Sequence, residues 1–259
     1  MRAHGLALTA LILSGALAGA QTKPGETTPT KPATPTALDR YLANWEAAMK
    51  NVESLAAEVN RIDKDTTFNK TSKFKGYALY MKAGKGTTAL NLALLEMKLE
   101  GKTDIADKFI CTGTFIYRFA PSTKEILAYE LPKPKPGTVA DDSVLSLMFG
   151  MPAAEVKKRF EMKLAKEDDW YVFIDITPRS KEDKVDFTRA RVVLYKNSYL
   201  PRMLWFEQPN GSESTWDIPR IDLKAKIERS MFDAPRTPPG WKMVQVPKDA
   251  DAPPKVIKP

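Results

Sequence analysis

The chain has 259 residues and a formal net charge of +8, and 43% of its residues are hydrophobic. This is the composition of a globular protein with a sizeable core, which excludes a disordered or low-complexity chain. The one histidine is His4 and the one cysteine is Cys111. Because His4 lies in a segment that we expect to be removed, histidine bases, serine–histidine nucleophiles and histidine-ligated metals are excluded. We expect a non-enzymatic protein with no metal and no cofactor.

The N-terminus is typical of a secretory signal peptide. Arg2 gives a basic start, an apolar run extends from Leu6 to Leu17, and residues 18–20 (Ala-Gly-Ala) form a small-residue cleavage pattern. The apolar run is too short to span a bilayer, so a retained membrane anchor is the less favoured alternative. We predict a cleaved signal peptide over residues 1–20 and a periplasmic or secreted protein without a lipobox cysteine.

A proline- and threonine-rich stretch follows the predicted cleavage point. Residues 21–36 contain Pro24, Pro29, Pro32 and Pro35 among threonines and lysines. Such a stretch has too little apolar surface to fold, so we predict an extended linker. Residues 248–259 are similar in composition, and we predict a disordered tail there. The folded domain is therefore expected over residues 37–247.

The domain is expected to open with an amphipathic helix. Apolar residues recur at helical spacing, namely Leu38, Tyr41, Leu42, Trp45, Met49 and Val52. Thr36 and Asp39 are placed as a capping pair at the start of this helix. Its apolar stripe needs a partner surface.

After Ser54 the period of the apolar pattern changes from helical to alternating. Alternating runs are found at 77–81, 90–94, 115–119, 170–176, 191–195 and 203–205. Thr112-Gly113 and residues 209–211 (Pro-Asn-Gly) are typical hairpin turns. The pattern predicts about ten or eleven antiparallel strands joined by hairpins.

The run of strands is interrupted by two short helices. Residues 141–143 (Asp-Asp-Ser) cap an apolar helix over 144–149, and Pro152 opens another that continues to Arg159. We predict a mainly β (α+β) fold: one large, curved antiparallel sheet with the opening helix and the short helices packed on its concave side. Two separate domains joined through the prolines of residues 132–140 are the alternative.

Three chemical signals in the sequence are better explained structurally. Residues 83–88 resemble a phosphate loop but lack its glycine spacing, so we interpret them as a hairpin turn. The paired acids at 141–142 and 167–169 fit a helix cap and a turn better than a catalytic pair. Lysines and arginines are interleaved with acids along the chain, which argues against nucleic acid and leaves at most peripheral contact with an anionic membrane.

One stretch carries a resemblance to a known family. Residues 109–131 begin Phe-Ile-Cys-Thr-Gly-Thr-Phe-Ile-Tyr-Arg-Phe-Ala-Pro. The stretch is similar to a family pattern that consists of a strand, an Asp-Gly turn and an aromatic strand ending in Tyr-x-Pro. In this chain Thr112-Gly113 takes the place of Asp-Gly, and residues 119–121 take the place of Tyr-x-Pro. Residues 74–77 and 232–246 resemble two further segments of the same pattern. On these residues the chain resembles the LolA/LolB superfamily of periplasmic lipoprotein carriers.

A finer resemblance covers nearly all of residues 38–246. Residues 110–114, 147–151 and 204–211 resemble a group of exported planctomycete proteins of this superfamily that have no assigned activity. The superfamily resemblance implies an opening helix, an incomplete antiparallel barrel and a lid of short helices over an apolar cavity. It also implies acyl chains of lipids or lipoproteins as the ligand.

The sequence and the resemblance together predict a carrier or binding protein for acyl chains. Each buried methylene of a lipid contributes about 0.8 kcal/mol, so binding requires no catalysis. The residues expected to line the apolar cavity are Leu79, Met81, Leu92, Leu94, Tyr117, Leu145, Met148, Trp170, Val172, Ile174, Met203 and Trp205. The sequence does not show which strand face points inward. The alternative is an interaction or sensory module with a filled interior that binds an envelope protein partner without carrying lipid.

Overall fold

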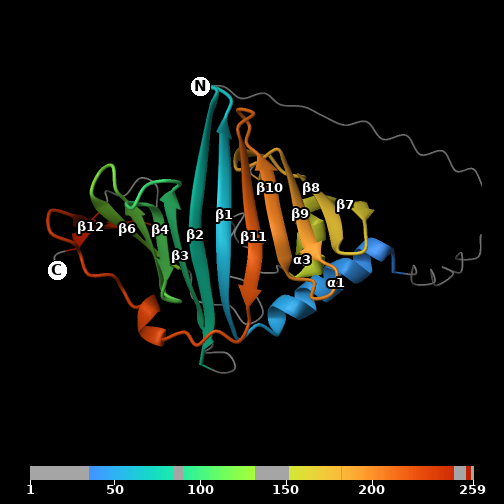
Figure 1. The fold of residues 1–259 in the computed structure, drawn as a ribbon, viewed down its shortest axis with the longest axis horizontal. Helices are drawn as coiled ribbons and strands as arrows, with labels where there is room; N and C mark the ends of the chain where they lie inside the picture. Colours follow the sequence, from blue (N-terminus) through green and yellow to red (C-terminus); the bar gives the residue numbers. More distant parts are fainter. Residues whose placement is uncertain (1–34, 85–89, 132–151, 182, 248–254, 258–259) are drawn as a thin grey trace, which may run out of the picture. The chain divides into compact units, whose positions relative to one another are not determined.

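The computed structural model describes residues 35–84, 90–131, 152–181, 183–247 and 255–257 (Figure 1). The described residues form a large sheet, two α-helices and two short 3₁₀ helices of three and four residues. The helical elements are α1 (Ala37–Lys50), α3 (Ala153–Arg159), η2 (Asp183–Val185) and η3 (Arg229–Phe232). The strands are β1 (Ser54–Asp65), β2 (Lys70–Ala83), β3 (Leu90–Leu99), β4 (Ile105–Cys111), β5 (Phe115–Ala120), β6 (Glu125–Glu130), β7 (Phe160–Glu167), β8 (Tyr171–Pro178), β9 (Arg189–Tyr195), β10 (Pro201–Glu207), β11 (Glu213–Asp222), β12 (Lys242–Val246) and β13 (Lys255–Ile257).

All of these strands belong to one sheet, which confirms the prediction of a curved, open, mainly antiparallel sheet. The strand order is β13-β12-β6-β5-β4-β3-β2-β1-β11-β10-β9-β8-β7, thirteen strands rather than ten or eleven. The two additional strands are at the C-terminal end of the chain. β12 pairs with β6 in parallel, because the chain returns along the sheet before β12 begins, and every other pairing is antiparallel.

The long strand β1 joins the two halves of the sheet. It pairs with β2 over its full length on one side and with β11 on the other. Hydrogen bonding therefore continues from the β2–β6 half to the β7–β11 half, and the two halves form one sheet. The predicted hairpin turns are also confirmed, since Thr112 and Gly113 connect β4 to β5 and residues 208–212 connect β10 to β11.

α1 begins and packs as its sequence predicts. The Thr36 hydroxyl accepts a hydrogen bond from the Asp39 backbone N–H, and the Asp39 carboxylate accepts one from the Thr36 N–H, which is a complete capping box. The buried face of the helix contains Leu42, Trp45 and Met49. These side chains form one core with β7–β11 and α3, which includes Val156, Phe160, Val172, Ile174, Ile176, Ala190, Val192, Leu194 and Leu204.

α3 confirms the predicted helix that opens at Pro152, and polar contacts hold it to α1. The backbone N–H of Ala153 donates to the Glu46 carboxylate at 2.9 Å, and Lys157 forms an ion pair with Asp39. Both helices therefore cover the β7–β11 half of the sheet from the same side.

A second core lies on the β2–β6 half. Its fully buried members are Leu92, Leu94, Ile110, Tyr117, Ile126, Ala128 and Phe232. Phe232 belongs to η3, and Ile227 and Trp241 from the flanking segment also pack against this core. The connection from β11 to β12 therefore covers the β2–β6 half in the way that α1 covers the other half.

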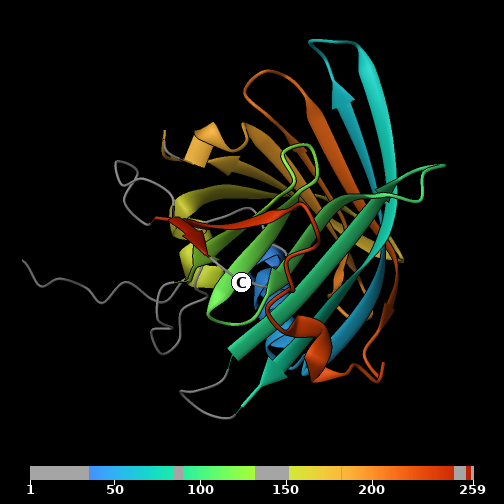
Figure 2. The ribbon, with the colours of Figure 1, turned by 90° about the vertical axis from the view of Figure 1, so that its left-hand side faces the viewer.

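The two cores lie on opposite faces of the sheet. Tyr80 of β2 packs against the core under α1, whereas its neighbours Leu79 and Met81 pack against the core under η3. Successive residues of a strand point to opposite faces, so α1 and η3 must be on opposite sides. In Figure 2 the sheet curls around α1, which confirms that α1 lies on the concave side. η3 lies on the outer side.

Arg61 of β1 connects strands on both sides of the sheet centre. Its guanidinium lies between the rings of Phe74 and Trp216, 4.1 and 5.0 Å from their centroids, and bonds the Asp107 carboxylate at 2.6 Å. Cation–π contacts and a charge-assisted hydrogen bond thus join β4, β2, β1 and β11 through one side chain.

Several sequence predictions fall outside the described residues or at their margin. The structure does not describe the signal peptide, residues 21–34 of the linker, the 144–149 helix with Leu145 and Met148, or residues 85–88 of the predicted 83–88 turn. Residues 255–257 lie in the segment predicted as a disordered tail, yet they form β13, which pairs with β12. Among the described helices, none is both long and apolar enough to cross a membrane.

Gly76 allows β2 and β3 to approach closely at the centre of the sheet. A Cβ at this position would lie 1.9 Å from the Glu96 carbonyl oxygen and 2.7 Å from the Met97 sulfur. Gly76→Ala should therefore lower the free energy of unfolding in urea by about 1–3 kcal/mol. Gly101→Asn is the control, because Gly101 has open space around it and a φ of +78° that asparagine tolerates. Equal stability of both variants would contradict the close approach.

Asp183 should make stability depend on pH. The Arg159 guanidinium, with the Ser180 hydroxyl, holds the pKa of this carboxyl below its usual value. A carboxylate whose pKa is lowered by folding stabilises the protein above its unfolded pKa, near ~3.9, and this contribution is lost as the pH falls through the folded-state value. Asp183→Asn should lower the Tm at pH 7, and the difference from wild type should shrink below about pH 4. A difference in Tm that stays the same from pH 7 to pH 3 would contradict this role of Asp183.

Candidate functional site

The predicted site residues of the first strands do come together. Leu92 and Leu94 pair across β3 with Met81 and Leu79, and Tyr117 completes the group from β5. They lie on the outer face of the sheet, under Phe232. Leu92, Leu94 and Tyr117 are between 1% and 8% exposed, so the chain's own residues cover nearly all of their surface. These residues therefore belong to a packed core, whereas the sequence analysis expects them to line an open apolar cavity.

The predicted residues of the middle strand lie in the other core. Val172 and Ile174 are both 0% exposed and face α1 on the concave side. Trp170 does not join them. It lies in the turn between β7 and β8, where the Asp168 carboxylate accepts hydrogen bonds from the Trp170 and Tyr171 backbone N–H groups, and it is 75% exposed. The alternating pattern in the sequence starts at Trp170, one residue before β8 begins, so it includes a residue that lies outside the strand.

Met203 and Trp205 occupy a third environment. The ladder pairs Met203 with Val193 and Trp205 with Arg191, on the face opposite to Val172 and Ile174. Both side chains are half-buried on the outer surface of β10. The ten predicted site residues that the structure describes therefore divide between two cores, an exposed turn and an outer surface, and they do not line one common cavity.

The concave side of β3–β6 carries residues that the sequence prediction missed. Two ladder rows cross these strands: one joins Ala93, Cys111, Ile116 and Tyr129, and the other joins Leu95, Phe109, Arg118 and Leu127. Apart from Arg118, which is exposed, all of these side chains are half-buried. We call these residues the concave face. They alternate with the outer core along each strand.

Arg118 is the one charged residue of the concave face, and it lies within its row between Phe109 and Leu127. The Arg118 guanidinium lies 5.8 Å from the centroid of the Phe109 ring, within range of a cation–π contact. The remaining members are apolar apart from the Cys111 thiol and the Tyr129 hydroxyl. The arrangement provides apolar contact surface with a single cation, and it contains no nucleophile with an adjacent base.

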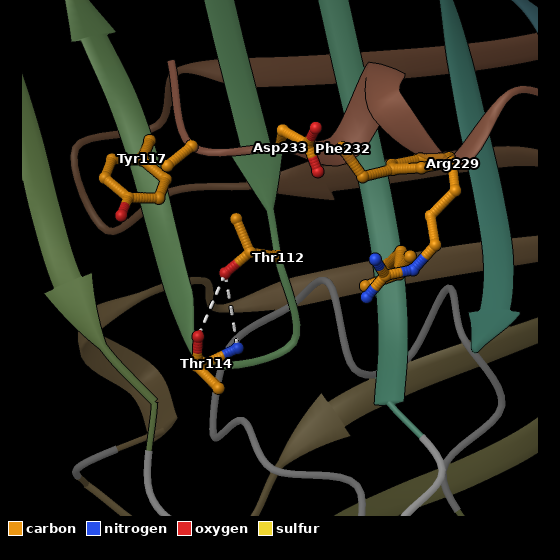
Figure 3. A pocket seen from close by; sticks show the side chains of 8 residues that line it. Thr112, Thr114, Tyr117, Arg229, Phe232 and Asp233 are labelled. Atoms are coloured by element: carbon orange, nitrogen blue, oxygen red, sulfur yellow. Dashed lines mark hydrogen bonds between the residues drawn. The ribbon is translucent and has the colours of Figure 1, made fainter. Parts of the chain in front are cut away.

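A small pocket opens on the outer side, between the β4–β5 turn and η3 (Figure 3). Its volume is about 220 Å³, and its apolar floor consists of Leu92, Tyr117 and Phe232. Burial raises the pKa of the Tyr117 phenol, which therefore stays neutral at physiological pH. Ligand pockets generally measure about 300–1,000 Å³, so this pocket is too small for a long acyl chain.

Polar groups form the rim of the pocket. Thr112 and Thr114 contribute hydroxyls that lie 3.2 Å apart, and Arg229 extends from η3 on another side (Figure 3). Asp233 is also a lining residue. The turn requires glycine at position 113, because Gly113 adopts a φ of +88° and a Cβ there would lie 2.7 Å from the Leu90 Cβ. Sequence reasoning found the turn but not this site, since Arg229 and Asp233 lie in a polar segment with no periodic pattern.

Comparison with known proteins gives no family assignment. No family model and no curated protein matches the chain. Among solved structures, the chain is similar to an uncharacterized conserved protein from Thermus thermophilus, with a TM-score of 0.47 and 9% identity over 82% of this chain and 100% of that one. A LolA superfamily protein from Nitrosomonas europaea has a TM-score of 0.34 and 12% identity over 75% of this chain and 96% of that one. The MucA/MucB complex structure from Pseudomonas aeruginosa has a TM-score of 0.41 and 9% identity over 83% and 72%.

All of these TM-scores are below 0.5, so the function of the chain is argued below from its own residues. The resemblance to exported planctomycete proteins stays a prediction.

The positions of the predicted site residues give a direct test by mutation. Phe232→Ala should lower the free energy of unfolding by about 3–5 kcal/mol, because it opens a cavity in the outer core. Trp170→Ala should change it by less than about 0.5 kcal/mol, because the indole is largely in water. Chemical denaturation measures both. A large loss for Trp170→Ala would show that this indole is part of a core.

Proposed function

We propose that this chain is a non-enzymatic protein of the cell envelope that binds acyl chains of lipids or lipoproteins on the concave face. The observation that carries the proposal is the pair of half-buried ladder rows across β3–β6. The same strands bury their other side under η3. An antiparallel sheet with water on one side normally shows polar residues there, and apolar side chains on both faces indicate a second apolar partner.

The energetics of such binding are favourable without chemistry. Apolar burial contributes about 0.8 kcal/mol per methylene, so ten methylenes laid on the concave face contribute at most about 8 kcal/mol before the cost of ordering the ligand. The Arg118 guanidinium stands beside these rows and is exposed. The anionic head group of a fatty acid or phospholipid would be placed favourably there, because a charge-assisted hydrogen bond to arginine is stronger than a neutral one.

An envelope location fits this ligand. The predicted signal peptide directs the chain out of the cytoplasm, into a compartment where acyl chains must be shielded from water. The absence of histidine outside the leader gives no support to catalysis, so binding is the whole proposed activity.

A second candidate is an interaction module that binds an envelope protein partner. The outer surface of β8–β10 favours it, because half-buried aromatic and sulfur-containing side chains gather there: Tyr171, Phe173, Tyr195, Met203 and Trp205. Arg189 lies over the Trp205 ring at 5.8 Å. Aromatic residues, methionine and arginine are the types enriched in protein interfaces.

The proposal is tested by measuring uptake of a fluorescent fatty acid, together with native mass spectrometry of the exported form. Ile116→Gln places an amide on the concave face and should weaken uptake by at least about fivefold, since a buried amide without a partner is unfavourable. Met203→Gln is the matched control on the outer surface and should leave uptake unchanged. Circular dichroism establishes that both variants remain folded.

Two results would overturn acyl binding. The first is an exported protein that is free of lipid and takes up no fatty acid. The second is equal loss of uptake in both variants. If the protein takes up no lipid and Met203→Gln weakens capture of a defined envelope partner, the interaction module replaces the carrier.

A further inference from the structure

We infer that the pocket between the β4–β5 turn and η3 is a binding site for a small aliphatic zwitterion of the α-amino acid class. The site lies on the outer side of the sheet and does not include the concave face. It is therefore independent of the acyl-binding proposal, and either can fail without the other.

The size of the pocket sets the size of the ligand. A volume of about 220 Å³ holds roughly seven or eight non-hydrogen atoms, taking about 30 Å³ for each water-sized group. This excludes long acyl chains and nucleotides. It fits an amino acid of the size of valine.

The floor of the pocket requires an aliphatic part in the ligand. Leu92, Tyr117 and Phe232 are 1%, 8% and 2% exposed, so they form a fixed apolar surface and not a set of mobile side chains. Because so little of this floor faces water, an isopropyl group contacts it mainly by dispersion, and the charged rim must carry most of the discrimination between ligands.

The rim requires both signs of charge. Arg229 and Asp233 both line the pocket, and within the described part of the chain neither side chain has an ion-pair or hydrogen-bond partner. A carboxylate alone would be attracted by Arg229 and repelled by Asp233, and an amine alone would meet the reverse. A ligand with a carboxylate and an ammonium group satisfies both residues.

The threonine hydroxyls add a directional contact. The Thr112 hydroxyl already accepts from the Phe115 N–H at 3.1 Å, which fixes its position, whereas the Thr114 hydroxyl is exposed at the rim. A hydroxyl can donate to a ligand carboxylate or accept from a ligand ammonium group.

The test uses three probes of nearly the same shape. L-Valine carries both charges, isovalerate lacks the ammonium group and isobutylamine lacks the carboxylate. Titration followed by ¹⁵N NMR should give saturable shifts of the Thr114 and Phe232 amides with L-valine in the millimolar range or tighter. Each analogue should bind at least about fivefold more weakly, because it lacks one of the two charge-assisted contacts with the rim and keeps the like-charge repulsion at the other.

Substitutions at two exposed residues test the contribution of each charge separately. Arg229→Gln should weaken L-valine binding and remove its advantage over isobutylamine, and Asp233→Asn should remove its advantage over isovalerate. Arg236→Gln, in the same segment but not among the lining residues, should bind as wild type does. The inference is overturned if L-valine gives no saturable shift, if the three probes bind equally, or if Arg236→Gln has the same effect as Arg229→Gln.

Discussion

The alternation of side chains across a continuous sheet is the constraint on which the rest of this structure depends. Outside the register shifts in the β1–β11, β9–β10, β3–β4 and β7–β8 pairings, successive residues of a strand point to opposite sides, so each residue's face is fixed by its position. The chain covers the concave side of β7–β11 with α1 and α3 and the outer side of β2–β6 with η3. The change of covered side is made around β1 and β2, where both faces contact apolar groups.

The centre of the sheet shows how this change is accommodated. Tyr80 reaches the core under α1, and burial raises its pKa to about 12, so its phenol is neutral there. Further along the same strand, Gly76 leaves room for Met97, which is 0% exposed. A third small core containing Ala57, Val59, Met97 and Ile218 fills the concave side between the two halves. This core and the contacts of Arg61 hold the two halves of the sheet together.

Much of this architecture could be predicted from the sequence, but the face that each strand presents could not. The capping pair at Thr36 and Asp39, the 112–113 turn and the helix after Pro152 depend on local chemistry, which a sequence displays directly. The phase of β3 does not, because Leu92 and Leu94 alternate with Ala93 and Leu95, and both pairs are apolar. Only the position of η3, a long way along the chain, decides which pair becomes core.

The same limit explains the site predictions. The sequence predicts that Leu79, Leu94 and Tyr117 lie together. Their partner Phe232 comes from a segment without periodicity, so its packing against them could not be predicted. What remains for a ligand is the opposite side of those strands and a small pocket edged by charge. The surfaces that we propose to be functional are thus those that the chain's own covering segments leave open.

Methyl-to-aromatic NOE measurements on leucine-labelled protein test the opposed faces most directly. The Leu94 methyl groups should show contacts with the Phe232 ring and none with Trp45 of α1. Contacts between Leu94 and Trp45 would place both cores on one side of the sheet and contradict the account.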